Sequence, residues 1–203
     1  MSQIKLKHSG GNSVIIAAPD SNPASDRTLK LPSNADGTVL TTTNPKAGNI
    51  LQVVQTFKTD AYSESVGAHN ASGVAMSVNI TPTSASNKLF IKAIAHISSS
   101  NSENIVGFNF SKDGTEQVLN SASVGSRVKC TATSGNERTY YISPCYAEYL
   151  VTAGGTSQQT WGVMMRSGSG STQTIKLNRG SADSDDANTL IPISSITIFE
   201  VAA

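Results

Sequence analysis

The chain has 203 residues, of which 37% are hydrophobic and 14% are charged, and its formal net charge is +1. So little charge excludes a disordered polyelectrolyte, and the scattered Lys and Arg residues do not form the basic face of a nucleic-acid binder. No segment approaches the roughly 20 apolar residues that span a bilayer, and the beginning MSQIKLKHSG turns polar too early for a secretory signal. We therefore expect a protein assembled in a cytoplasm, without nucleic acid and without membrane insertion.

The first 47 residues are predicted to form an N-terminal module of short strands. The candidate strands are IKLKH, SVIIAA, RTLKL and TVLTT, with a hairpin turn at Asp36-Gly37, where positive φ is tolerated. The composition shifts at Pro45 to Gly48, which places a domain boundary at about residue 47. A segment near the ~40-residue limit for independent folding, with few large apolar residues, cannot readily build its own core. It either packs on the rest of the chain or interlocks with copies of itself, and we favour the second.

Two-residue alternation dominates residues 48–203 and predicts an all-β domain, an antiparallel, jelly-roll-like β-sandwich. No window offers a capped helical pattern of similar quality. The residues expected to share the apolar face of their strand are, in chain order, Val74, Met76, Val78, Ile80, Leu89, Ile91, Ala93, Ala95, Ile97, Val106, Phe108, Phe110, Cys145, Ala147, Tyr149, Val151, Trp161, Val163, Met165, Ile175, Leu177, Ile196 and Ile198.

Turn signals separate these strands. Asp113-Gly114 lies between NIVGFNFSK and TEQVL and predicts a hairpin, because its turn needs positive φ. Gly154-Gly155 and the run SGSGS from Ser167 to Ser171 mark further turns or loop tips.

Two cysteines, Cys130 and Cys145, are present. Their spacing permits a disulfide, and the alternative of two reduced thiols, one of them in a core, is favoured in a cytoplasm. Without a C-x-x-C pair they are a poor signal for a metal or redox site.

No motif predicts catalysis, a cofactor or a metal ion, so we expect a protein that is not an enzyme. Asp183, Asp185 and Asp186 resemble a calcium loop, but the sixth position lacks Gly and Ser194 stands where the bidentate Glu belongs. The histidines His8, His69 and His96 lack zinc-site spacing. His96 is expected to be a half-buried strand residue and His69 a loop residue. The chain has no G-x-S-x-G elbow, P-loop or H-E-x-x-H motif.

The aromatic residues allow two interpretations. Trp161 and the tyrosines (Tyr62, Tyr140, Tyr141, Tyr146 and Tyr149) could form a platform for sugar rings. Core packing is favoured for Trp161, because it alternates with Val163 and Met165. Tyr140 and Tyr141 follow the polar segment CTATSGNERT and are expected to be the more exposed pair.

Two stretches resemble known proteins. Residues 4–45, IKLKHSGGNSVIIAAPDSNPASDRTLKLPSNADGTVLTTTNP, resemble a recurrent segment in tail-fibre, head-fibre-like and other virion proteins of phages, notably phages of marine bacteria. There a strand pair is followed by Pro, Asp-Arg-Thr-Leu and Asp-Gly elements in this order. NKLFIKAIAHIS and the segment TLIPISSITIFEVAA are similar to the terminal β-domains of such proteins.

The resemblance implies a homotrimeric structural protein on the virion surface, with other tail or capsid proteins as partners. In one role the chain is a fibre or spike whose projecting domain binds host-surface carbohydrate or protein. In the other it is a capsid decoration trimer that braces the head. A polysaccharide depolymerase is a remote third reading, because neither an acid pair nor long β-helical repeats are present.

Overall fold

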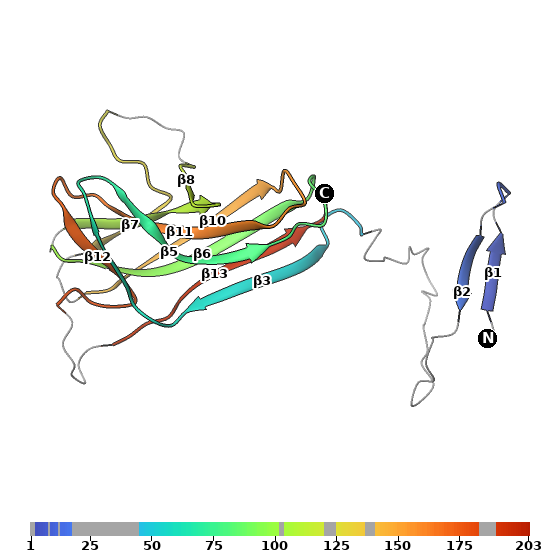
Figure 1. Cartoon of the computed structure of the whole chain (residues 1–203), viewed down its shortest axis with the longest axis horizontal. Coiled ribbons are helices and arrows are strands. Elements are labelled where there is room, and N and C mark those ends of the chain that lie inside the picture. Colours follow the sequence, from blue (N-terminus) through green and yellow to red (C-terminus); the bar gives the residue numbers. More distant parts are fainter. Residues whose placement is uncertain are drawn as a thin grey trace, which may run out of the picture. The chain divides into compact units, whose positions relative to one another are not determined.

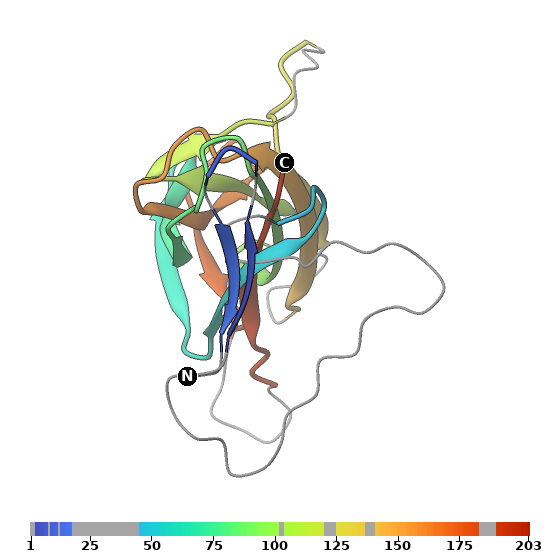
Figure 2. The same cartoon turned by 90° about the vertical axis from the view of Figure 1, so that its right-hand side faces the viewer.

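The computed structural model describes residues 3–7, 9–11, 13–17, 45–101, 104–119, 125–136, 141–182 and 190–203 (Figures 1 and 2). These residues form strands, turns and irregular segments. The strands are β1 (Gln3–Lys7), β2 (Ser13–Ala17), β3 (Ile50–Lys58), β4 (Tyr62–Val66), β5 (Ala71–Ile80), β6 (Lys88–Ser99), β7 (Asn104–Lys112), β8 (Thr115–Gln117), β9 (Ala132–Asn136), β10 (Ser143–Thr152), β11 (Gln159–Ser167), β12 (Gln173–Leu177) and β13 (Ser194–Val201). Within the described part, no helix has the length and apolar character needed to cross a membrane.

The chain divides into two compact units, residues 1–39 and residues 40–203. In the first unit, β1 and β2 form an antiparallel hairpin in which Ile4 lies opposite Ile16 and Lys5 lies opposite Ile15. The predicted strands RTLKL and TVLTT and the predicted turn at Asp36-Gly37 lie outside the described residues. The boundary at residue 47 stays a prediction.

The second unit is a sandwich of two antiparallel sheets (Figure 1). The larger sheet has the order β3-β13-β6-β12-β4, and β10 pairs with β6. Both β13 and β12 pair with β6, β13 along its first half and β12 at its end. The smaller sheet has the order β5-β11-β7-β8, with β9 also paired to β7. This arrangement confirms the predicted all-β, jelly-roll-like antiparallel sandwich.

The core lies between the two sheets and follows the predicted alternation closely. Along β6, the predicted apolar face from Leu89 to Ile97 is buried, while Lys92 and His96 are only partly covered. The largest fully buried side chains include Trp161, Phe108, Phe110, Leu89, Ile91, Ile97, Met165, Ile175, Leu177, Ile196 and Ile198. Phe108 and Phe110 meet edge to face with ring centroids 5.5 Å apart, which is a favourable aromatic geometry.

The prediction for β5 is wrong at one position. Val74 was expected to share a face with Met76, but Val74 is partly exposed and Ala75 is buried beside Met76. The cause is an irregular pairing with β11, where the register shifts between Val163 and Met164 and again before Arg166. Such a bulge moves the following side chains to the other face of the strand.

The Asp113-Gly114 turn is confirmed. It joins β7 to β8, Lys112 and Thr115 lie opposite each other, and φ is 51° at Asp113 and 78° at Gly114. Two consecutive positive φ values define the turn whose backbone twist suits a two-residue hairpin. The Asp113 carboxylate also accepts a hydrogen bond from the Thr160 amide at 2.8 Å, which fixes this turn to β11.

A buried carboxylate fastens β13 to the rest of the larger sheet. Glu200 is fully buried and accepts hydrogen bonds from Gln52 Nε2 at 2.5 Å, from Asn87 Nδ2 at 2.6 Å and from the amide and hydroxyl of Thr83 at 2.7 and 2.8 Å. Burial raises the pKa of Glu200, but these hydrogen bonds outweigh it and hold the pKa below the ordinary value. The charge is thus stabilised by neutral donors from β3 and from the loop between β5 and β6.

We predict that Ile198→Ala lowers the free energy of unfolding by about 2–5 kcal/mol, because Ile198 is fully buried in β13, which is paired on both sides. The neighbouring substitution Thr197→Ala faces away from the core and is the matched control, with an expected loss well below that of Ile198→Ala. Urea or thermal unfolding of both variants measures the difference. Equal losses would show that β13 is not part of the core.

Candidate functional site

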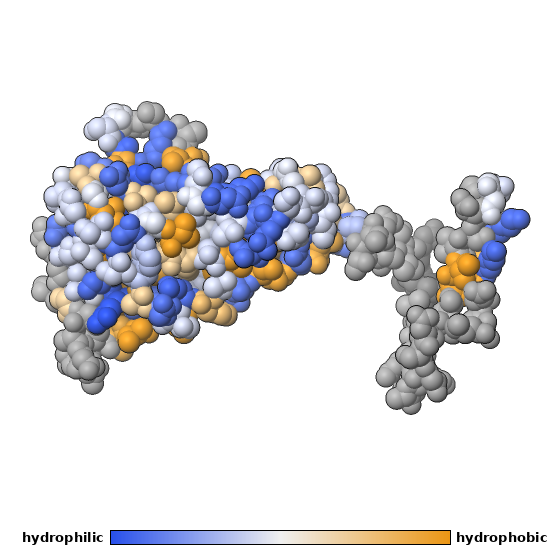
Figure 3. Space-filling model, viewed as in Figure 1, coloured by the Kyte–Doolittle hydropathy of each residue, from blue (hydrophilic) through white to orange (hydrophobic). Residues whose placement is uncertain are grey.

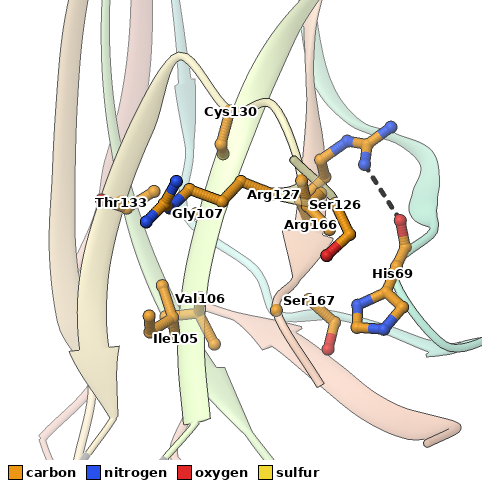
Figure 4. A pocket seen from close by; sticks show the side chains of 12 residues that line it. His69, Ile105, Val106, Gly107, Ser126, Arg127, Cys130, Thr133, Arg166 and Ser167 are labelled. Carbon is orange, nitrogen blue, oxygen red and sulfur yellow. Dashed lines mark hydrogen bonds between the residues drawn. The ribbon is translucent and has the colours of Figure 1, made fainter. Parts of the chain in front are cut away.

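The best candidate for a site is a pocket of about 480 Å³ at the outer surface of the smaller sheet (Figure 4). That volume lies within the roughly 300–1,000 Å³ typical of small-molecule sites. The pocket draws its lining from β7, β9, β11 and the loops beside them, and the residues are His69, Ile105, Val106, Gly107, Ser126, Arg127, Val128, Cys130, Thr133, Arg166, Ser167 and Gly168.

Gly107 lets β9 and its preceding segment lie close against β7. A Cβ atom at this position would stand 2.2 Å from the Ala132 carbonyl oxygen and 2.7 Å from the Cys130 Sγ atom. No side chain fits there without a shift of the backbone. The small residue therefore sets how closely the wall formed by residues 126–133 approaches the β7 side of the pocket.

An ion pair between Arg166 and Glu116 holds the Arg166 side of the pocket in place. Arg166 Nε and Nη2 bind the two oxygens of Glu116 at 2.7 and 2.9 Å, and both side chains are less than a fifth exposed. Arg166 Nη1 also donates to the His69 carbonyl oxygen at 3.0 Å, which Figure 4 marks with a dashed line. The Arg166 guanidinium holds the pKa of Glu116 below its ordinary value, and the hydrogen bond from Asn109 contributes in the same direction.

Asn109 extends this support to the pocket's loop. It is buried, its Nδ2 donates to Glu116 and to the Lys129 carbonyl, and its Oδ1 accepts from the amide and hydroxyl of Thr131. This hydrogen-bond network, which runs Arg166–Glu116–Asn109–Thr131, therefore connects β11, β8 and β7 to the segment that precedes β9. Forked guanidinium–carboxylate bonds of this kind fix geometry as well as charge.

Both cysteines are free thiols, as the favoured alternative predicted. Cys130 lies at the pocket wall, where its thiol contacts the Phe108 and Ala132 carbonyl oxygens at 3.2 and 3.0 Å. Burial raises the pKa of Cys130, and burial together with the neighbouring Cys130 raises the pKa of Cys145 to about 12. Since the thiolate is the nucleophilic form, neither group is activated for attack at neutral pH.

The histidines are separated in the described structure. His69 lies in the loop before β5 with φ of 58° and lines the pocket, whereas His96 lies on β6. The His96 Nδ1 atom is buried without a hydrogen-bond partner. His8 and the acidic residues Asp183, Asp185 and Asp186 lie outside the described residues. Among the residues that are described, no three His, Cys, Asp or Glu side chains group together as metal ligands would.

The aromatic residues do not gather into one exposed platform in the described part of the chain. Trp161 is buried, its Nε1 donates to Gln159 at 3.1 Å, and its ring lies 6.3 Å from that of Tyr149. The favoured prediction of core packing for Trp161 is thus confirmed. Tyr141 and Tyr146 are exposed, and Tyr140 lies outside the described residues.

The pocket walls combine charged, polar and apolar groups. They offer guanidinium groups, hydroxyls of Ser126 and Ser167 and an apolar side with Ile105 and Val106. Small-molecule sites commonly combine a mostly apolar lining with a few such polar groups. Reasoning from the sequence missed this pocket, because its residues are spread from position 69 to position 168 and carry no motif.

Comparisons with known proteins assign no family. No protein-family model matches the chain, and no curated protein matches it significantly. A solved structure of infectious bursal disease virus VP2 in a subviral particle is 13% identical, with a TM-score of 0.41, over 88% of this chain and 42% of that chain. A structure of the Gx strain of that virus is 15% identical, with a TM-score of 0.37, over 95% of this chain and 47% of that chain. The chain spans less than half the length of these viral chains.

We predict that Glu116→Gln destabilises the protein by about 1–3 kcal/mol, because it leaves the partly buried Arg166 guanidinium without its counter-charge. The exposed pair Lys58–Asp60 provides the control, and Asp60→Asn should leave the melting temperature unchanged. Differential scanning calorimetry at neutral pH measures both. If Glu116→Gln melts with the wild type, the ion pair does not support the pocket.

The burial of His96 should make the stability of the protein depend on pH. Burial lowers the pKa of His96, and a hydrogen bond with the Ile193 backbone opposes the shift only in part. The unfolded chain therefore takes up a proton near the ordinary value of 6.5 while the folded chain resists it, so stability falls as the pH drops below about 6.5. The pKa values of Glu116 and Glu200 are lowered, so their contributions are lost only further down, below about 4.5.

The variant His96→Gln should flatten the decline in stability between pH 7 and pH 5, with the decline below 4.5 unchanged. Chemical unfolding at each pH measures the profile. His69→Gln is the control, because His69 is exposed and its substitution should retain the wild-type profile. If His96→Gln has the same pH dependence of stability as the wild type, the decline between pH 7 and pH 5 comes from other groups.

Proposed function

We propose that the chain is a structural protein of a bacteriophage particle, carried on the virion surface as a homotrimer with the sandwich as its projecting domain. The observation that carries the proposal is the apolar face of the β1–β2 hairpin. Ile4, Leu6 and Ile16 lie on this face by the pairing register, and they are 63%, 58% and 59% exposed. Lys5, Lys7 and Ile15 lie on the opposite face, which is therefore mainly charged.

A hairpin of this kind needs a partner. Two strands without further packing are marginally stable in water, and no described residue of the first unit covers the apolar face. Burying each of the three side chains contributes roughly 1.5–3 kcal/mol. Copies of the same hairpin supply an apolar surface of matching size, and an interlocked trimer would bury all of these faces around its axis.

The sequence likeness supports the same role. Residues 4–45 resemble a recurrent segment of phage fibre and virion proteins, and this segment contains the hairpin. We assign it to trimerisation or to attachment on the particle. Other tail or capsid proteins would be its partners, and assembly would take place in the cytoplasm of the bacterial host.

Two roles on the particle are considered, a receptor-binding fibre or spike and a capsid decoration protein. The pocket of the sandwich favours a fibre or spike that binds host-surface carbohydrate or protein, since it offers a preformed concave site with polar groups. A decoration protein that braces the capsid is the second candidate. A polysaccharide depolymerase is the remote third candidate. Counting copies per particle separates the roles: a few to a few dozen indicate an appendage, and hundreds indicate decoration.

We predict a mass of three times the 21.1 kDa of one chain for the purified protein at micromolar concentration, measured by light scattering. The double variant Ile4→Lys and Ile16→Lys places charges on the apolar face of the hairpin and should reduce the mass to that of one chain. Lys5→Ala on the opposite face is the control and should retain the trimer. A wild-type mass of one chain would overturn the interlocked trimer.

A shortened chain tests attachment to the particle. Removing residues 1–47 should leave a folded sandwich, shown by an unchanged cooperative melt, that no longer joins particles. Incorporation of the shortened chain at the full level would show that the attachment surface lies in the sandwich instead.

A further inference from the structure

The outer face of the larger sheet carries three cross-strand rows of side chains. We call "outer face" the side of β3, β13, β6 and β10 that points away from the core. The pairing register defines each row across these strands, in the order β3-β13-β6-β10. The rows are Val53–Phe199–Phe90–Leu150, then Gln55–Thr197–Lys92–Glu148, then Phe57–Ser195–Ile94–Tyr146.

The two flanking rows are apolar except for Ser195, and their outermost side chains are open to solvent. Val53, Phe57, Tyr146 and Leu150 are 52%, 61%, 54% and 59% exposed. Figure 3 shows orange, apolar residues along the lower side of the domain, where Figure 1 draws β3. β3 is also an edge strand, which pairs only with β13 among the described strands. An exposed apolar edge of this length is an aggregation hazard unless something covers it.

The middle row is polar and neutral as a whole. Lys92 Nζ lies 3.3 Å from the Glu148 carboxylate and 5.9 Å from the ring centres of Phe90 and Tyr146. Gln55 Nε2 donates to the Thr197 hydroxyl at 2.9 Å. Because the single positive and the single negative charge pair within the row, these three rows carry no net charge that would repel identical rows. Lys88, in the next row of β6, adds one positive charge at the end of the face, where its Nζ atom donates to the Thr152 hydroxyl.

We infer that a second copy of this chain packs on the outer face, related by a two-fold axis that runs parallel to the strands between β13 and β6. This axis places β3 of one copy over β10 of the other and β13 over β6. Val53 then meets Leu150, Phe199 meets Phe90, and Phe57 meets Tyr146, so apolar groups face apolar groups at these positions. Ser195 meets Ile94, which is the one polar-to-apolar contact of the flanking rows. In the middle row the Gln55 amide meets the Glu148 carboxylate, and the Thr197 hydroxyl meets the Lys92 ammonium.

The alternative two-fold axis, which runs across the strands, is disfavoured by charge. It would bring Lys92 of one copy over Lys92 of the other and Glu148 over Glu148. Like charges placed opposite each other are destabilising, whereas the axis along the strands avoids both contacts. Twisted sheets that stack face to face also keep their strands aligned within about 30°.

The size of the face indicates a weak contact for a single pair of chains. Four strands about 4.8 Å apart and nine residues at about 3.3 Å each cover on the order of 600 Å². A stable interface uses about 800 Å² on each partner. The pairing should therefore appear at high protein concentration, or where copies are already held close together.

The inference rests on the proposed self-assembly of the chain, but it uses different residues. The hairpin would join three chains, and the outer face would join chains of neighbouring trimers. A two-fold contact and a three-fold contact coexist in one assembly when they occupy separate surfaces.

Cross-linking of the full-length chain tests the arrangement directly. Val53→Cys and Leu150→Cys are made as two separate variants, mixed at high concentration and treated with a short bis-maleimide. The two positions lie at opposite ends of one row, roughly 14 Å apart within a chain, but they face each other across the two-fold axis. The mixture should give several times more cross-linked pairs of the two different variants than a mixture of Val53→Cys with Val118→Cys, an exposed control position outside the face.

The native thiols should not compete in this reaction, because burial raises the pKa of Cys130 and Cys145. Equal cross-linking in the two mixtures would overturn the inference.

A second measurement separates this inference from the proposed trimer. The wild type should rise in mass between micromolar and high micromolar concentration. Leu150→Glu should abolish this rise, while Val118→Glu should retain it. The mass at low concentration should stay at three chains in both variants, because the hairpin is intact. If Leu150→Glu associates as the wild type does, the outer face is not the contact, even when the trimer stands. If the wild type is a single chain at low concentration, the trimer fails, while the cross-link between Val53→Cys and Leu150→Cys would still support the face.

Discussion

The sandwich depends on the position of β13 between β3 and β6. Its inward side chains Ile196 and Ile198 complete the core, and its buried Glu200 collects hydrogen bonds from β3 and from the loop between β5 and β6. A charge placed in the interior is costly unless donors surround it. The fully satisfied Glu200 carboxylate therefore specifies one register for β13, since a slip of one residue would turn Glu200 to the surface and expose both isoleucines.

That register has consequences on both sides of the molecule. Inside, it aligns the larger sheet so that its apolar rows meet Phe108, Phe110 and Trp161 of the smaller sheet. Outside, it aligns Phe199 with Phe90 and Thr197 with Lys92, which creates the alternating rows of the outer face. The pocket of the smaller sheet has its own support, the ion pair of Arg166 and Glu116. Core, surface and pocket are thus held by two separate buried polar groupings.

The sequence predicted the parts of the fold in which alternation is regular. Burial alternates along all of β10 and β13 and along β6 from Lys88 to Ile97, so their core residues followed from periodicity. In β7 and β11 the large apolar residues alternate, although the glycines and some polar residues between them are buried as well. β3 was not predicted, because an edge strand with Val53 and Phe57 exposed lacks the polar outer side that makes alternation visible. Glu200 was missed because a carboxylate in an apolar strand has no local sign of its buried donors. The pocket and the outer face depend on register between distant strands, which a single sequence does not contain.

The partners in the larger sheet are far apart along the chain, and this sets the pace of folding. Gln55 and Thr197, which bond across β3 and β13, are separated by 142 positions. Sheets built from such distant pairings fold slowly, because the long chain segment between the two strands loses conformational entropy before the strands form any stabilising contact. During that interval β3 has no neighbour, and its exposed valine and phenylalanine are open to other chains. Recovery of native protein should therefore depend on synthesis temperature and concentration more strongly than its final stability would suggest.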